Sequence, residues 1–203
     1  MDIEPVCWPD DYFAAALEGQ LMEVLRTLPR TRWTERGPLG ATLLHYASIG
    51  PNTTAARALL VHGLDPNARH NTGCNCVHDA ALNAQPHVLE VLCAAGADLR
   101  ATVSGSSALD LTFPRSAQCA RVLVANGVRL STVREEYRHL ITPELEAFER
   151  GVLRCRAAVV ALLALKRRQC VDTMRQLDRW VVREVGYAVW ATRTDRVWML
   201  MGR

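Results

Sequence analysis

The chain has 203 residues, of which 49% are apolar and 22% are charged. These ordinary globular values exclude general disorder, and the length suits one medium domain or two small ones. The formal net charge of +3 is too small to indicate nucleic-acid binding by itself. No apolar run of the sequence approaches the ~20 residues of a membrane span. The odd number of cysteines and a start without a basic-then-apolar leader favour an intracellular protein, cytoplasmic or nuclear.

Two short apolar segments separated by Gly19 lie within residues 10–28. Asp10 and Asp11 precede the first of them, and acidic side chains stabilise the first turn of a helix. The sequence therefore predicts a pair of short helices near this end of the chain.

A repeated segment follows. The stretch from Gly40 to Ala47 recurs 33 residues later, from Gly73 to Ala80, and a third copy begins at Gly105. Each copy starts with a residue that caps helix N-termini well, followed three positions later by a side chain that can reach back to it. These pairs are Thr42 with His45, Asn75 with His78, and Ser107 with Asp110.

A second apolar segment follows each capped one and ends at a glycine, such as Gly63 or Gly96. Glycine at that place is typical of a left-handed helix C-cap. The repeating unit is thus helix, short loop, helix and turn. We predict structural roles for the cap residues and the two glycines: Thr42, His45, Asn75, His78, Gly63 and Gly96.

This unit resembles the ankyrin repeat, whose period is about 33 residues. The resemblance covers roughly residues 10–131, with a capping repeat over 10–28 and three further repeats. It implies an all-α, ankyrin-repeat solenoid. It also implies a non-enzymatic protein-interaction module, an adaptor or scaffold that binds its partner on a concave surface.

The resemblance places this concave surface on the hairpin turns and the first helices of the repeats. The implied partner-binding residues of the turns are Leu39, Ala41, Asn71, Thr72, Cys74, Val103, Ser104 and Ser106, and those of the first helices are Ile49, Leu82 and Asn83. Their side chains are small and nearly uncharged. This favours a protein partner with apolar or extended polar segments, and it makes nucleic acid an unlikely partner.

Residues 132–203 do not continue the repeat and form the second predicted domain, a helical capping or interaction segment. A long helix is expected over 143–168, because Pro143 suits a first helical position and apolar residues recur with a 3.6-residue period. A second helix is expected over 171–191, which would complete a helical hairpin. Its polar stripe carries arginines and large aromatics that are candidate partner-binding residues: Arg179, Arg183, Tyr187 and Trp190.

Cys74, Cys76 and His78, with His70 nearby, suggest a zinc site, since thiolate and imidazole are zinc ligands. We favour packing for the cysteines and helix capping for His78, because no second pair of cysteines has zinc-like spacing. The sequence also lacks a nucleophile elbow and a phosphate-binding glycine loop. We therefore expect no metal, no cofactor and no catalytic residues.

Two other functions stay open. Ankyrin arrays with a C-terminal box occur in ubiquitin-ligase substrate adaptors, and Val152 to Leu163 is similar to the start of an elongin-binding box. The cullin-selecting Leu-Pro segment is replaced by Gln176 to Arg179, so any such box would be degenerate. The chain could instead be a structural subunit of a larger assembly. The sequence does not indicate an oligomeric state.

Overall fold

A computed structural model describes residues 10–113 and 115–167 of the chain. The second tail helix expected over 171–191, and with it the predicted helical hairpin, lies outside the described residues. The same holds for four candidate contact residues: Arg179, Arg183, Tyr187 and Trp190.

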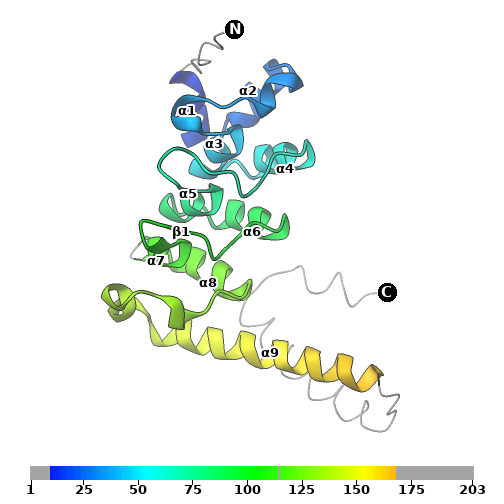
Figure 1. Cartoon of the computed structure of the whole chain (residues 1–203), viewed down its shortest axis with the longest axis vertical. Helices are drawn as coiled ribbons and strands as arrows, with labels where there is room; N and C mark the ends of the chain where they lie inside the picture. The colour runs from blue at the N-terminus through cyan, green and yellow to red at the C-terminus, as the bar shows by residue number, and fades with distance from the viewer. Residues whose placement is uncertain (1–9, 114, 168–203) are drawn as a thin grey trace. The chain divides into compact units, whose positions relative to one another are not determined.

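Helices of the described part pair as the repeat pattern predicts, each pair forming an antiparallel helix–turn–helix (Figure 1). The predicted all-α repeat solenoid is confirmed. The first helices of the pairs are α1 (Asp10–Leu17), α3 (Leu43–Ile49), α5 (Cys76–Leu82) and α7 (Ala108–Thr112). The second helices are α2 (Leu21–Thr27), α4 (Thr53–Val61), α6 (Pro86–Ala94) and α8 (Ala117–Ala125).

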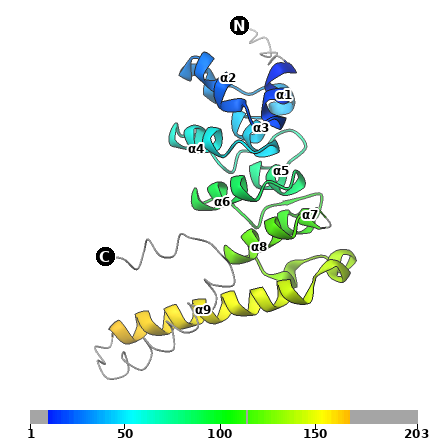
Figure 2. The ribbon, with the colours of Figure 1, turned by 180° about the vertical axis from the view of Figure 1, so that it is seen from behind.

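The pairs stack so that first helices contact first helices and second helices contact second helices. Helix α3 packs on both α1 and α5, and α5 packs on α7, while α4 packs on α2 and α6, and α6 packs on α8. Seen from behind, the same two columns of helices run along the unit (Figure 2). Leucines predominate among the largest fully buried side chains: Leu21, Leu25, Leu43, Leu44, Leu59, Leu89, Leu92, Leu109 and Leu123.

Short hairpins link one pair to the next. In the first two, isolated antiparallel bridges join Arg36 to Thr42 and Arg69 to Asn75. In the third, β1 (Thr102–Val103) pairs with β2 (Ser106–Ser107). The stretch before α3 also contains two 3₁₀ turns, η1 (Arg30–Thr34) and η2 (Pro38–Gly40).

The predicted caps are present. All three first helices that follow a hairpin begin with a capping box, formed by the cap residue and the side chain three positions later. Gly63 and Gly96 follow α4 and α6 with φ angles of 100° and 80°. Both glycines therefore occupy the left-handed region that the prediction assigned to them.

The chain divides into two compact units between Thr142 and Pro143. The first unit continues beyond α8 through the 3₁₀ turns η3 (Leu130–Thr132) and η4 (Glu135–Leu140). The sequence predicts that the part of this segment from residue 132 onward belongs to the helical tail, but its described backbone forms short 3₁₀ turns. Asp110 fixes it to α7, because its carboxylate accepts the Arg134 backbone N–H at 2.9 Å.

The second unit contains α9 (Pro143–Arg167), which matches the long helix expected over 143–168. Over residues 143–160, for which burial is described, its buried apolar residues are Leu145 and Ala158. The 3.6-residue apolar pattern of the sequence places Val159 on the same face as Leu145, but Val159 is exposed, as is Val160. The predicted face is therefore wrong at Val159: at 100° per residue, the buried Ala158 lies about 140° around the helix from Leu145 and not on the same face.

Candidate functional site

Arginines spaced 33 residues apart tie successive hairpins together. Arg36 Nη1 donates to the Gly40 carbonyl at 2.8 Å within its own hairpin and to the Arg69 carbonyl of the next hairpin at 3.0 Å. Arg69 Nη1 repeats this pattern, with the Gly73 carbonyl at 2.8 Å and the Thr102 carbonyl at 3.1 Å. Thr102 holds the equivalent place in the third hairpin, so this arginine ladder has two steps.

Backbone and amide groups add further links between neighbouring repeats. The Asn71 N–H donates to the Leu39 carbonyl at 2.7 Å, and the Asp98 N–H donates to Asn67 Oδ1 at 2.6 Å. From the turn between α7 and α8, Arg115 Nη1 donates to the carbonyl of Leu82, the last residue of α5, at 3.2 Å. The tips of successive hairpins therefore keep a fixed register.

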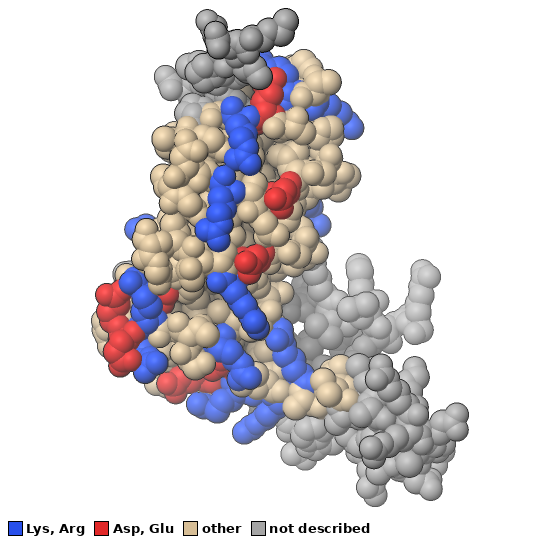
Figure 3. All heavy atoms as spheres, viewed as in Figure 1, with Lys and Arg blue, Asp and Glu red and all other residues tan. Residues whose placement is uncertain are grey.

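Basic side chains are spaced along the face of the repeat unit shown in Figure 3, with acidic ones beside them. Arg36 and Arg69 are exposed residues whose guanidinium groups are engaged with backbone carbonyls. Part of the positive charge of the unit thus holds the hairpins in register.

The predicted contact residues of the hairpins and first helices differ in exposure. Leu39 is the most open, at 65% exposed, and its backbone adopts a left-handed φ of 57°. Four others are exposed, and the remaining six are half-buried. The exposed residues are Asn71, Thr72, Asn83 and Ser104, and the half-buried ones are Ala41, Ile49, Cys74, Leu82, Val103 and Ser106.

One further surface residue was missed by the sequence analysis. Leu17 is the last residue of α1, Ile49 is the last of α3, and Leu82 is the last of α5. The three residues therefore occupy equivalent ends of successive first helices. Leu17 is 49% exposed. The spacing of about 33 residues between these positions could have identified Leu17 from the sequence. The capping repeat, however, lacks the cap-residue motif by which the other repeats are aligned. We call Leu17, Ile49 and Leu82 the apolar stripe.

The cap residues are buried and form their cap hydrogen bonds, whereas His45 Nε2 and His78 Nε2 are buried without a hydrogen-bond partner among the described residues. The Thr42 N–H donates to His45 Nδ1 at 3.0 Å, and the Asn75 N–H donates to His78 Nδ1 at 3.3 Å. Burial lowers the pKa of His45 to about 4, and the charge that nearby His70 can carry adds to this effect. Both capping imidazoles are therefore neutral near pH 7.

Cys76 has the environment of a core residue. It is fully buried, and burial together with the charge of Asp79 raises the pKa of its thiol far above the ordinary value. Such a thiol is a poor nucleophile and a poor metal ligand. Cys76 and His78 therefore lie in the environments of a core residue and a capping residue, respectively.

A different set of side chains meets beside them. Ligand atoms of His70, Cys74 and Asp79 all lie within 4.8 Å of one another. His70 Nε2 lies 3.5 Å from Asp79 Oδ1, and both side chains are largely buried, at 14% and 12% exposed. Burial raises the pKa of the Asp79 carboxyl, and the imidazole limits this rise.

Ankyrin repeats, in three copies, are the family whose model matches residues 12–103. No curated protein gives a significant match to the chain. Among the helices that the structure describes, none combines the length and apolarity needed to cross a bilayer. The family match, the capping boxes and the stacked helix pairs agree: residues 12–103 are an array of the ankyrin-repeat family.

Proposed function

We propose that the chain is a non-enzymatic protein-binding module whose partner lies across the hairpin tips and the ends of the first helices. The apolar stripe carries this proposal. Ankyrin arrays generally mediate protein–protein interaction, and Leu17, Ile49 and Leu82 repeat along the array at one helix position.

Leu39 supports the same surface from the hairpin side. A leucine in the left-handed region is energetically unfavourable, and this one also exposes most of its side chain to solvent. Neither feature helps the isolated fold. A partner that covers Leu39 would recover its burial energy.

The spacing of the stripe favours one kind of partner. Packed helices lie about 8–10 Å apart, so the stripe offers an apolar contact at about that interval. A partner helix presents side chains about 10.5 Å apart at positions i and i+7. An extended strand presents them about 7 Å apart on one face and fits less well. The partner segment is an amphipathic helix.

The test is quantitative capture of a partner from the native source, followed by binding measurements with the purified pair. The variant Leu17→Gln with Leu39→Asn removes the two exposed apolar groups, and asparagine tolerates a left-handed φ. Val61→Gln is the matched control, because Val61 is 90% exposed on α4, a second helix.

The double variant should weaken binding by about 2 kcal/mol or more, as truncation of interface hot spots does. The control should bind like the wild-type chain. Equal affinity of all three proteins for the captured partner would contradict the proposal.

The degenerate ligase box stays a second candidate. Helix α9 runs without interruption through Val152–Leu163, and it exposes Val159 and Val160 as an apolar pair. Co-purification of the full chain with elongin-type or Skp-type subunits, lost on Val160→Asp, would support this role. Absence of such subunits from the captured material would count against it.

A further inference from the structure

We propose that His70, Cys74 and Asp79 form a binding site for a single zinc ion. They supply one nitrogen, one sulfur and one oxygen ligand, a set suited to a borderline-soft divalent cation. The proposal rests on the geometry of this cluster and is independent of the proposed protein-binding function.

The distances are close to those of a zinc site. Zinc bonds of about 2.0–2.3 Å in tetrahedral geometry put ligand atoms about 3.3–3.7 Å apart. His70 Nε2 and Asp79 Oδ1 already have this separation, at 3.5 Å. With all three ligand atoms within 4.8 Å, a shift of about 1 Å in the Cys74 side chain would close the set.

The backbone around the ligands is held in place. His70 and Cys74 face each other in the second hairpin, where the His70 N–H donates to the Cys74 carbonyl at 3.1 Å. The arginine ladder fixes this hairpin from both sides. Asp79 lies in the first turn of α5, directly after the His78 side chain that completes the capping box. Metal binding therefore needs little reorganisation.

Thr72 supplies the support that metal-bound histidines require. His70 Nδ1 accepts the Thr72 backbone N–H at 3.3 Å and lies 3.0 Å from Thr72 Oγ1, so the neutral ring of this structure carries its proton on Nε2. Metal binding at Nε2 moves the ring proton to Nδ1, which then gives up the bond from the Thr72 N–H and donates to Thr72 Oγ1 instead. A partner of this kind sets the tautomer and orients the ring.

One of the three ligands, Asp79, is a largely buried carboxylate whose negative charge a cation would stabilise. It lies near two thiols, Cys74 and Cys76, and its described ion-pair partner is His70. A divalent ion between His70 and Asp79 replaces a weak pair with two metal–ligand bonds. Its binding deprotonates Cys74 and releases that proton to solvent.

Three protein ligands leave the fourth tetrahedral position for water or a partner side chain. Cys74 and its neighbour Thr72, both candidate partner-binding residues, are half-buried and exposed, respectively. Three-ligand sites of this type bind metal reversibly more readily than closed four-ligand sites.

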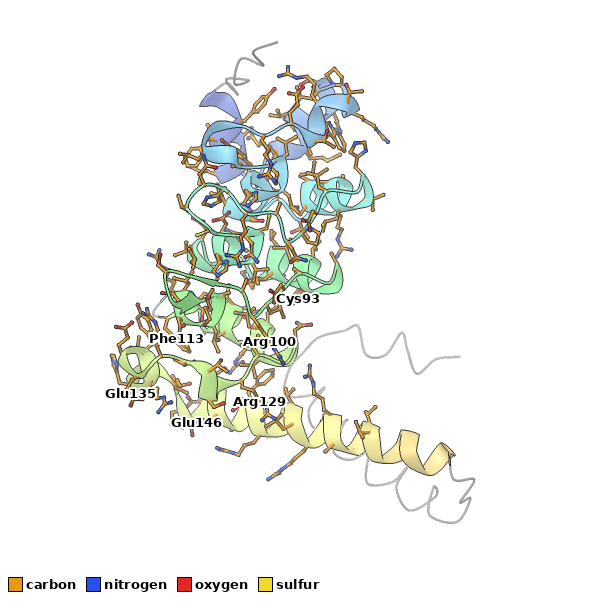
Figure 4. The ribbon with its side chains drawn as sticks, viewed as in Figure 1. Cys93, Arg100, Phe113, Arg129, Glu135 and Glu146 are labelled. Atoms are coloured by element: carbon orange, nitrogen blue, oxygen red, sulfur yellow. The ribbon has the colours of Figure 1, made fainter. Side chains whose placement is uncertain are left out.

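The experiment uses the reduced full chain and two probes, Co²⁺ and Zn²⁺. Co²⁺ reports a bound thiolate through its charge-transfer absorption and tetrahedral geometry through its visible bands, and Zn²⁺ competition then gives the affinity. Test variants are Cys74→Ser, Asp79→Asn and Thr72→Val. Matched controls are Cys93→Ser on α6 (Figure 4), whose half-buried thiol lies outside the cluster, and the exposed His87→Gln.

We expect about one equivalent of metal, with the thiolate band present in the wild-type chain and both controls. Cys74→Ser should abolish the band and weaken Zn²⁺ binding at least a hundredfold. Thr72→Val should weaken it about ten- to a hundredfold, as loss of an orienting partner does. Circular dichroism of the metal-free proteins identifies any variant that fails to fold. If Asp79→Asn fails to fold, Cys74→Ser and Thr72→Val decide the outcome. Absence of a thiolate band from the wild-type chain, or equal Zn²⁺ affinity of Cys74→Ser and wild type, would overturn the proposal.

Discussion

Gly50 marks the tightest contact between the first helix pair and the rest of the array. A Cβ atom at this position would lie 1.8 Å from the Ala16 carbonyl oxygen. The backbone φ of Gly50 is −122°, which any residue can adopt, so an added methyl group acts only through this clash. Gly50→Ala should therefore force α1 away from α3.

The size of the effect follows from what α1 would lose. Asn52 Nδ2 donates to the Ala16 carbonyl at 2.6 Å, and Asn52 Oδ1 accepts the Leu21 N–H at 3.2 Å. Each bond contributes about 1 kcal/mol, and overpacking costs about 1–3 kcal/mol. Together these terms predict a loss of about 3–5 kcal/mol.

The assay is urea denaturation of the full chain, followed by circular dichroism. Because a repeat array loses stability locally, the first helix pair should unfold in a separate, earlier transition. Gly151→Ala is the control: its Cβ would meet open space inside α9, so it should stabilise that helix by about 1 kcal/mol. An unchanged urea midpoint for Gly50→Ala would refute the packing argument.

Three further substitutions test individual contacts. Asp110→Ala removes a buried acceptor of the Arg134 N–H and should lower the free energy of unfolding by about 2–4 kcal/mol, measured by urea denaturation. His45→Ala should lower it by about 1–3 kcal/mol while partner affinity per folded molecule stays unchanged, and a lost affinity at unchanged melting temperature would contradict its structural role. Arg69→Ala should lower the melting temperature through the lost ladder bonds, whereas the exposed Arg26→Ala should leave it unchanged.

Local chemistry explains why the repeat could be predicted from the sequence. A cap residue such as Asn75 and its partner His78 lie three positions apart, and their hydrogen bonds form within one helix turn. The glycines after α4 and α6 are equally local, since a left-handed C-cap depends on one residue. Helix bounds therefore follow from short stretches of sequence.

The links between repeats could not be predicted in the same way. Arg36 reaches a carbonyl 33 residues away, and this depends on how one hairpin lies against the next. The contact between His70 and Asp79 likewise joins a hairpin residue to a helix residue, and it depends on how the two elements pack. Sequence spacing therefore pointed to Cys76 and His78 instead of Asp79. Leu17 was missed because its importance comes from alignment with Ile49 and Leu82 in space.

Hydrogen exchange of the chain, alone and with its captured partner, tests the proposed binding surface most directly. The account predicts that the partner slows exchange at the hairpins over 36–42 and 69–75 and at the ends of α1, α3 and α5. The second helices α4 and α6 should exchange as in the free chain. Protection confined to α9 or to the second helices, with the hairpins unchanged, would contradict binding across the apolar stripe.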